Sequence, residues 1–204
     1  MIDISEELDE RVIDRDPINQ FKRWFDDAVV SGMKLPEAMT LATATPEGGP
    51  SARVVLLKDV DNDGFVFYTN YRSAKARDLE ANPQAALVFY WSQFDRQVRV
   101  EGTVERVSTE ESRAYFKTRP RESQIGAWAS PQSNVIEKRE VLEARVAELE
   151  QLYGDGEIEC PEHWGGYRVK PTRIEFWKSR VGRLHDRIVY ERVGENWKIS
   201  RLAP

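Results

Sequence analysis

The sequence predicts a mainly β protein with peripheral helices (α+β), in which an antiparallel sheet closes into a barrel. Roughly six or seven segments carry the alternation or the β-branched runs of strands. Helical patterns lie between these segments rather than in a separate half of the chain. No repeat or low-complexity linker divides the 204 residues. We therefore expect a polar, mobile segment over residues 1–15 and a single domain over residues 16–204.

The first element is a predicted helix between Asp16 and Gly32. Phe21, Trp24 and Ala28 recur at the spacing of one helical face, Asp16 is a good cap before a proline, and Gly32 is a good stop. Residues 39–70 then predict three antiparallel strands, because apolar runs are separated by the turn sequences PEGG and DNDG.

The middle of the chain predicts a short helix over residues 73–83 and two strands over 84–91 and 96–107. A capping box at Ser108 opens the next helix, which ends at Pro120. A long helix follows from about Ile136 to Tyr153. Its expected inner side carries Val141, Leu142, Val146, Leu149 and Leu152. The last strands are expected over 165–178, 184–193 and 196–202.

Composition excludes several classes of function. The chain has 30 Lys and Arg against 35 Asp and Glu, and this net charge of −5 argues against a nucleic-acid-binding protein. The single cysteine, Cys160, forms no internal disulfide and suits a reducing compartment. The sequence has no apolar run of membrane-spanning length and no signal-peptide pattern at its start. We expect a cytoplasmic protein that is not bound to a membrane.

Common catalytic motifs do not occur in the sequence. There is no glycine-rich phosphate loop, and Cys160 and His163 lack the second pair of ligands that a zinc site needs. We therefore expect no metal.

Cations and hydroxyls placed at the ends of predicted elements are the remaining candidates for chemistry. Arg53 and Lys58 flank an apolar run, either as solvated strand ends or as ligands of a phosphate. Tyr115 and Arg119 share one helical face, with Ser123 beyond a proline. They fit a second phosphate, although for this segment taken alone an ordinary amphipathic helix end is the commoner explanation.

Two further segments have the same ambiguity. Gln132 and Ser133 lie in a turn before a helix, where a serine is usually a cap but also suits an anion. In the sequence RLHDR, Arg183, His185 and Arg187 alternate, so a strand would aim all three to one side. Such a set requires an anionic ligand or an acidic partner, and a structural salt-bridge ladder remains the alternative.

These segments together resemble the pyridoxamine 5′-phosphate oxidase family, flavin enzymes that make pyridoxal 5′-phosphate. The resemblance runs in order from about Asp16 to Pro204. It is carried by RVVLLK, FYTN, RQVRVEG, YFKTRPRESQIGAWASPQS, WGGYRV, IEFW, RLHDR and WKISRLAP. It implies a Greek-key-like split β-barrel that binds FMN, and a homodimer with FMN in each of two sites at the subunit interface.

The resemblance also implies a role for individual residues. The FMN-binding residues would be Arg53, Val54, Val55, Leu56, Leu57, Lys58, Tyr68, Thr69, Lys75, Gln97, Gln132, Ser133, Trp177 and Arg187. The substrate would be held by Lys58, Tyr115, Arg119, Ser123, Arg183 and His185. Arg183 and His185 would lie beside the reacting carbon as catalytic residues, with His185 either binding the ring hydroxyl or moving a proton. The implied reaction oxidises pyridoxamine or pyridoxine 5′-phosphate with dioxygen, and yields hydrogen peroxide and, from the amine, ammonia.

The chain departs from the family pattern in two places. Ala74 stands where an arginine for the FMN phosphate is expected, which predicts weaker retention of FMN unless Arg72 compensates. The start of the chain lacks the arginine- and tyrosine-bearing segment that covers the substrate in some members. Two alternatives stay open: another split-barrel flavin oxidase or reductase, such as those of phenazine biosynthesis, and a non-catalytic protein that binds flavin or vitamin B6 phosphate.

Overall fold

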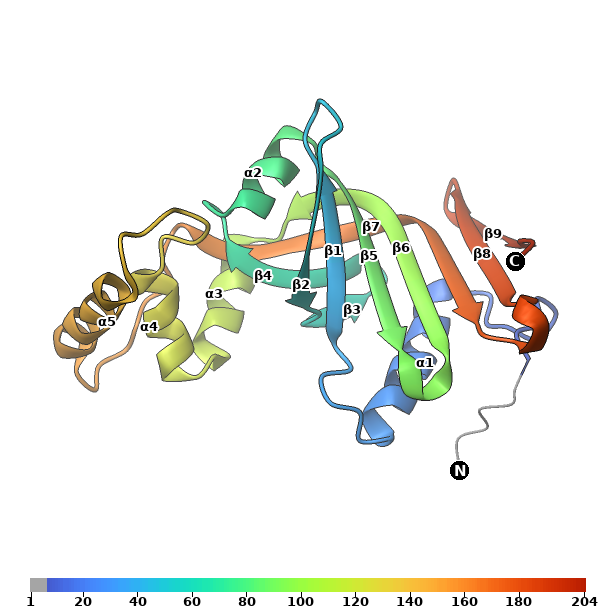
Figure 1. Ribbon diagram of the computed structural model, residues 1–204, viewed down its shortest axis with the longest axis horizontal. Helices are drawn as coiled ribbons and strands as arrows, with labels where there is room; N and C mark the ends of the chain where they lie inside the picture. Colours follow the sequence, from blue (N-terminus) through green and yellow to red (C-terminus); the bar gives the residue numbers. More distant parts are fainter. Residues whose placement is uncertain (1–6) are drawn as a thin grey trace.

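The computed structural model describes residues 7–204, and its main feature is one curled antiparallel sheet of nine strands (Figure 1). Seven strands follow the order β2-β1-β5-β6-β7-β4-β3, while β8 pairs with β7 and β9 with β8. Their bounds are β1 Ala38–Ala44, β2 Pro50–Leu56, β3 Asp59–Asp61, β4 Gly64–Asn70, β5 Gln84–Trp91, β6 Arg96–Arg106, β7 Trp164–Lys178, β8 Asp186–Val193 and β9 Asn196–Arg201. The predicted fold class, mainly β with peripheral helices, is confirmed.

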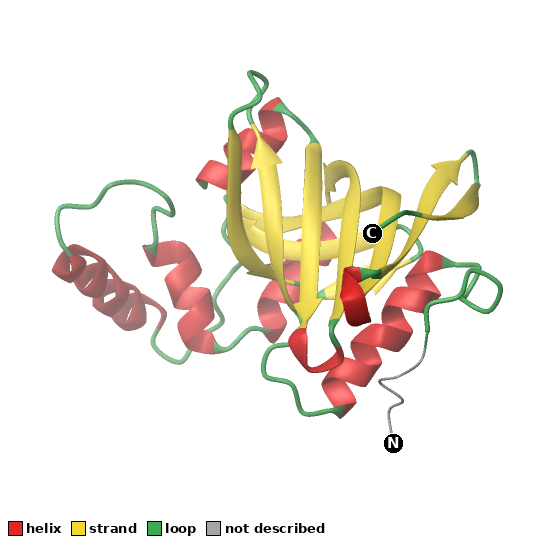
Figure 2. Cartoon of the chain, turned by 45° about the vertical axis from the view of Figure 1, so that its right-hand side comes forward, coloured by secondary structure: helices red, strands yellow, loops and turns green. Residues whose placement is uncertain are grey.

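Five α-helices of the described chain lie outside this sheet (Figure 2). They are α1 Pro17–Val30, α2 Ala74–Ala81, α3 Thr109–Thr118, α4 Arg121–Ala129 and α5 Arg139–Tyr153, with two 3-10 turns at Ser92–Phe94 and Val181–Arg183. Helix α4 was not expected from the sequence. It forms because Ile125 and Ala129 bury their side chains in a second apolar cluster with Leu149 of α5 and Trp164 of β7. Between residues 7 and 204, no helix has the length and apolar character needed to cross a membrane.

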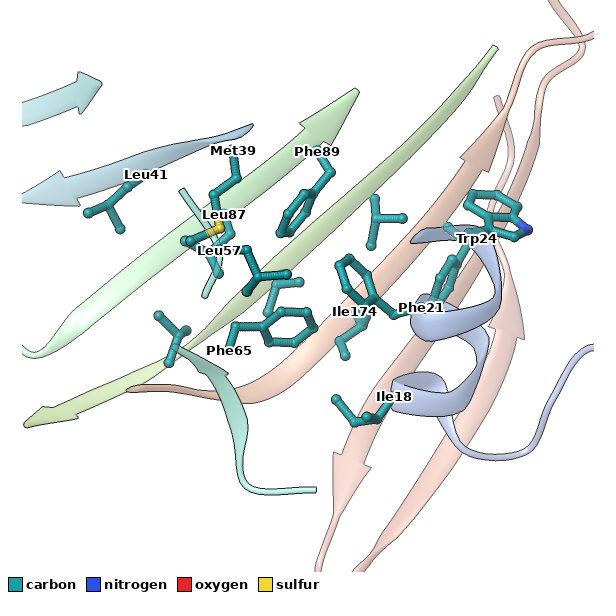
Figure 3. Packing of buried hydrophobic residues seen from close by; sticks show 14 of the residues in the cluster. Ile18, Phe21, Trp24, Met39, Leu41, Leu57, Phe65, Leu87, Phe89 and Ile174 are labelled. Atoms are coloured by element: carbon teal, nitrogen blue, oxygen red, sulfur yellow. The ribbon is translucent and has the colours of Figure 1, made fainter. Parts of the chain in front are cut away.

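The main core fills the inside of the curled sheet, and α1 closes it (Figure 3). The Phe21 ring meets the rings of Phe65 and Phe89 edge-on, each at 4.9 Å between centroids. Trp24 contacts Phe176 of β7 in the same way at 5.2 Å. Aromatic pairs of this geometry stabilise a core beyond the area that they bury. The predicted helix between Asp16 and Gly32 is therefore present, and Asp16 caps it by accepting from the Ile18 backbone N–H.

Two sequence predictions about element bounds are wrong. Residues 39–70 form four strands rather than three, because the chain leaves β2 after Leu56 and starts a short strand, β3, at Asp59. The long helix begins at Arg139, three residues later than expected. Val141 and Leu152 of that helix are exposed, since α5 packs along a narrower face than its apolar pattern suggests.

Strand β7 is 15 residues long and pairs with three other strands. It pairs with β4 near its start, with β6 along most of its length, and with β8 near its end. A bulge between Glu101 and Gly102 bends the β6–β7 pair. Gly102 is required there, because a Cβ atom would lie 2.0 Å from the carbonyl oxygen of Lys170.

The segment before α1 lies against the last strands over the residues that are described. Leu8 and Ile13 are buried, and the Tyr190 hydroxyl donates to the Asp14 carbonyl oxygen at 2.6 Å. Arg201 of β9 pairs with Glu10 at 2.7 Å. The mobility expected for residues 1–15 remains a prediction, and its first six residues fall outside the described residues.

Candidate active site

A cavity of about 290 Å³ lies between β4, the start of β7 and helix α4. Its lining includes five residues that the sequence singled out: Tyr68, Thr69, Arg119, Ser123 and Gln132. We call this the helix-side cavity. Residues that are distant in sequence therefore meet at this cavity.

Three parallel aromatic rings stand beside this cavity. The Tyr68 ring stacks on Tyr115 at 4.0 Å and on Trp164 at 5.3 Å between centroids. Gly166 makes room for this stack, because a Cβ atom there would lie 2.8 Å from Cε1 of Tyr68. Burial raises the pKa of both tyrosines. Their hydroxyls therefore keep their protons at neutral pH and remain donors for an anionic ligand.

Arg119 supplies a half-buried cation that has no acidic partner among residues 7–204. Its guanidinium lies over the Trp164 ring at 4.6 Å. Among residues 7–204, the buried Nη1 of Arg119 has no hydrogen-bond partner. Burial lowers the pKa of Arg119, so its charge is costly to hold in the free protein. An anion in the helix-side cavity would satisfy both the charge and the free donor.

A second cationic position lies next to the same cavity. Lys75, on the first turn of α2, is buried, and its Nζ donates to Thr69 Oγ1 at 3.2 Å and to Gln132 Oε1 at 3.3 Å. Burial and the nearby Arg53 charge lower the pKa of Lys75. Lys75 and Arg53, together with the Thr69 hydroxyl and the Gln132 amide, suit a phosphate.

Within the described residues, Arg53, unlike Lys75, has an acidic partner in addition to its hydrogen bonds. It donates to Thr43 Oγ1 at 2.8 Å and to Ser51 Oγ at 2.6 Å, and it pairs with Asp78 at 3.6 Å. The rest of the RVVLLK segment is mixed: the Leu57 side chain belongs to the core, while Val54, exposed, faces outward. We therefore predict that this segment contacts a ligand through its backbone or through side chains on its outer face. The residues concerned are Val54, Val55, Leu56 and Leu57.

Three further residues are Lys58, at the end of the RVVLLK segment, Ser133, next to Gln132, and Ala74, next to Lys75. Lys58 is exposed just after β2, and its backbone N–H donates to the Val66 carbonyl of β4. Ser133 has a φ of 70° in the turn that carries Gln132. Ala74 begins α2, directly before Lys75. The missing arginine would thus have extended from a helix N-terminus, where anions bind favourably.

The remaining candidates gather at the other end of β7. The register places Gln97 opposite Trp177, and Trp177 opposite Arg187, so the three form one row across β6, β7 and β8. His185 packs its ring on Trp177 at 4.7 Å. Its Nδ1 accepts a hydrogen bond from the Arg180 backbone N–H at 3.2 Å. A neutral His185 therefore carries its proton on Nε2, which is the donor available to a ligand. We call Gln97, Trp177, His185 and Arg187 the strand-end group.

The expected alternation of Arg183, His185 and Arg187 along a strand is wrong. Strand β8 starts only at Asp186, and Arg183 ends a 3-10 turn with a φ of 63°, after Gly182 at 71°. These positive φ angles break the extended backbone, so the side chains have no common strand face. Arg183 is exposed on this turn, whereas Arg187 lies in the sheet.

Arg187 has an acidic partner that sequence reasoning missed. Its Nε donates to Glu175 Oε1 at 2.8 Å, and its Nη1 donates to the Ala203 carbonyl at 3.0 Å. The signal in the sequence was a charged residue inside the apolar run IEFW, two positions before Trp177. The salt-bridge alternative for this segment is therefore present at Arg187.

One chain does not bring the two groups together. Tyr68 pairs with Gly166, and Trp177 lies eleven residue steps after Gly166 along β7. At about 3.3 Å per residue, this is about 36 Å of strand. Figure 1 shows helices α3 and α4 on the opposite side of the molecule from β8.

Residues 25–153 match the family described as pyridoxamine 5′-phosphate oxidase. The chain belongs to this family. Residues 164–204 match the C-terminal dimerisation region of pyridoxine 5′-phosphate oxidase, which includes the strand-end group except for Gln97. The resemblance stated from the sequence is thereby confirmed.

Relatives named pyridoxine/pyridoxamine 5′-phosphate oxidase are similar over nearly the whole chain. The protein from Rubrobacter xylanophilus is 60% identical, covering 94% of this chain and 88% of that protein. The protein from Trichormus variabilis is 54% identical, covering 98% and 94%.

Two solved structures share the fold of this oxidase family member. PhzG from Burkholderia lata, solved with tetrahydrophenazine-1-carboxylic acid, has a TM-score of 0.92 and 33% identity, covering 98% of both chains. An FMN-binding protein related to pyridoxamine 5′-phosphate oxidase, from Nostoc punctiforme, has a TM-score of 0.72 at 18% identity, covering 90% of this chain and 97% of that one. The latter supports the split-barrel fold alone.

FMN is the cofactor of this oxidase family, and the residues present fit it. The buried Lys75, with Thr69 and Gln132 around its ammonium group, offers a desolvated cation and hydrogen-bonding groups for a phosphate. The row that contains Trp177 offers an aromatic ring, an amide and a guanidinium for a flat polar ring system.

Proposed function

We propose that this chain oxidises pyridoxamine 5′-phosphate and pyridoxine 5′-phosphate to pyridoxal 5′-phosphate, with FMN as cofactor and dioxygen as electron acceptor. When bound, FMN supplies the acceptor for the hydride that leaves C4′ of the substrate and passes the two electrons to dioxygen, which becomes hydrogen peroxide. The amine substrate also takes up one water molecule and releases ammonia, which balances the reaction.

The observation that carries this proposal is the half-buried Arg119 with a free Nη1 beside the helix-side cavity. We assign the phosphate of the substrate to Arg119, assisted by Ser123, Tyr115 and Lys58. A dianionic phosphate would pair with the guanidinium and accept from the phenol and the hydroxyl. This contact orients the substrate by a group that takes no part in the chemistry.

The phosphate of FMN is assigned to the neighbouring cations, Lys75 and Arg53, together with Thr69, Gln132 and Ser133. Tyr68 lines the same cavity as Thr69, Arg119 and Gln132. Because Lys75 is already buried, a phosphate gains from an interaction that water screens little.

The strand-end group would serve the two ring systems. Trp177, Gln97 and Arg187 would flank the flavin, and His185 would donate from Nε2 to the substrate. Arg183, on its exposed turn, would close over the substrate beside the reacting carbon.

We infer that the working site forms in a homodimer, from the helix-side cavity of one subunit and the strand-end group of its partner. The match to a dimerisation region over residues 164–204 supports this arrangement. So does the strand contour of about 36 Å between the two groups within one chain. We also place the enzyme in the cytoplasm, because its one cysteine suits a reducing compartment.

An absorption experiment tests the function. Protein saturated with FMN is mixed with pyridoxamine 5′-phosphate without oxygen, and then air is admitted. We expect the oxidised-flavin band to bleach, then return with formation of hydrogen peroxide and pyridoxal 5′-phosphate. Pyridoxamine without phosphate is the control and should reduce the flavin far more slowly. An unchanged band in folded, FMN-loaded protein would instead indicate another substrate, and failure to bind FMN would refute the flavin assignment itself.

A further inference from the structure

Glu175 lies at the centre of an ion-pair network on one face of β6, β7 and β8. Its carboxylate pairs with Arg187 at 2.8 Å, with Arg173 at 3.4 Å and with Arg99 at 3.5 Å. Glu101 completes the network by pairing with Arg99 and Arg173, both at 3.0 Å. Three arginines therefore share two carboxylates, which leaves one net positive charge.

The two carboxylates differ in burial. The Glu175 side chain is 2% exposed, whereas the Glu101 side chain is 39% exposed. A buried carboxylate is costly unless it is paired and fully hydrogen-bonded. Burial alone would raise the pKa of Glu175, but the hydrogen bond from Arg187 and the charges of the three arginines lower it overall. Glu175 is therefore a buried anion at neutral pH.

The register places Glu175 beside the proposed flavin-contacting row. Gln97, Trp177 and Arg187 form that row, and the next row on the same face contains Arg99, Glu175 and Val189. Glu175 and Trp177 are two residues apart on β7, so their side chains lie on the same face. Glu175 itself stands one row back from the ligand.

The contacts fix the orientation of Arg187. Glu175 holds its Nε, and the Ala203 carbonyl near the chain end holds its Nη1. Because a guanidinium is planar, two fixed nitrogens determine the direction of the third. Arg187 is thus oriented by groups that do not belong to the predicted ligand-binding set.

We propose that Glu175 is the positioning residue for Arg187: the hydrogen bond to Nε sets the plane of the guanidinium and directs Nη2 toward the flavin. This inference rests on the proposed function, because it assumes that Arg187 faces FMN. It assigns to Glu175 a role in cofactor binding that is exerted through Arg187.

A double-mutant cycle on FMN binding tests this assignment without using turnover. Apo-protein is titrated with FMN, and quenching of the flavin fluorescence gives the dissociation constant. The variants are E175A, E175Q and R187A, and both Glu175 changes combined with R187A. E101Q, alone and with R187A, is the matched control, because Glu101 belongs to the same network and does not contact Arg187.

The expected pattern is a loss that depends on Arg187. E175A should weaken FMN binding about tenfold and E175Q about threefold, since its amide oxygen still accepts from Nε; both are in the range of coupled neighbours. In the R187A background, each change should have less than about a twofold effect, as should E101Q in either background. If E175A does not fold, the E175Q pair decides the question.

Two results would overturn the inference while the proposed function stands. The first is an equal loss for the Glu175 variants with and without Arg187, which would make Glu175 a structural residue only. The second is an Arg187-dependent loss for E101Q as large as that for E175Q, which would make the effect one of general charge. A wild-type protein that does not quench FMN would instead remove the proposed function, and this inference with it.

Discussion

Replacing Arg119 by methionine should stabilise the ligand-free protein and weaken substrate binding at the same time. In the wild-type protein, the buried Nη1 of Arg119 has no hydrogen-bond partner among residues 7–204, and burial lowers the pKa of the guanidinium. An unsatisfied buried donor costs about 1–3 kcal/mol. The stacking of Arg119 on Trp164 returns about 0.5–1 kcal/mol, and methionine keeps part of that contact. The net expectation is about 1 kcal/mol of added stability, or about 2–4 °C in Tm for a domain of this size.

The same substitution removes the proposed partner of the substrate phosphate. A hydrogen bond to a charged group contributes about 1.5–3 kcal/mol, so KM for pyridoxamine 5′-phosphate should rise about 30-fold, which corresponds to about 2 kcal/mol. The assays are thermal unfolding of the apo-protein and steady-state kinetics of the FMN-loaded enzyme.

Lys117→Met is the matched control for Arg119→Met. Lys117 lies on α3, and its side chain is 66% exposed and pairs with Glu157. A surface pair of this kind contributes about 0–1 kcal/mol, so Tm should fall slightly, if at all, and KM should stay unchanged. A lower Tm for R119M with an unchanged KM would refute the reasoning, because Arg119 would then be a structural residue.

Three other substitutions test separate parts of the site. Ala74→Arg adds a cation at the start of α2 and should tighten FMN binding about tenfold in a fluorescence titration; an unchanged dissociation constant would mean that the phosphate lies elsewhere. Gly166→Ala places a Cβ atom 2.8 Å from Tyr68 and should cost about 1–3 kcal/mol in urea unfolding, with a changed near-UV circular dichroism spectrum. Gly126→Ala is its control, because a Cβ atom there meets nothing within 4 Å and should stabilise α4 by up to about 1 kcal/mol. Glu175→Gln should destabilise the protein at neutral pH, and this difference should shrink as the pH falls below about 4.5, because the unfolded carboxyl takes up its proton before the folded one does. Urea unfolding of both proteins at several pH values measures it, and a difference that does not change with pH would contradict the ion-pair explanation.

Local patterns predicted the sheet well where one face is buried. In the strand over 96–107, polar residues such as Gln97 and Arg99 alternate with buried valines, and β6 spans Arg96–Arg106. The period of two fixes which side chains share a face, so the row that contains Gln97 was implicit in the sequence. The residues that lie opposite Gln97 on neighbouring strands depend on long-range register, and the local pattern did not predict them.

The 181–187 segment shows where pattern reasoning fails. Its alternation of cations fits a strand, but Gly182 and Arg183 take positive φ angles and form a turn. Nothing in a period of two distinguishes a strand from a turn that is held by distant contacts. Here the Arg180 backbone N–H is fixed by His185, and the Arg180 side chain pairs with Asp186 at 2.8 Å. Helix α4 was missed for a related reason, since it depends on the packing of Ile125 rather than on an amphipathic pattern.

Arg119 lies beside the start of β7 and Arg187 beside its end, and their charges are compensated in opposite ways. Arg119 has no acidic partner in the described part of the chain, and burial lowers its pKa, so the free protein bears the cost of its desolvation. The proposed substrate phosphate would relieve that cost. Arg187 is already paired, and the hydrogen bond to Glu175 raises its pKa. It gains little further stability from a ligand, but its direction is set before the ligand arrives. A site that joins the two from different subunits would therefore take its affinity mainly from the helix-side cavity and its alignment mainly from the strand-end group. On this argument R119M should raise KM far more than it lowers kcat, and E175Q should do the reverse with substrate once FMN is saturating.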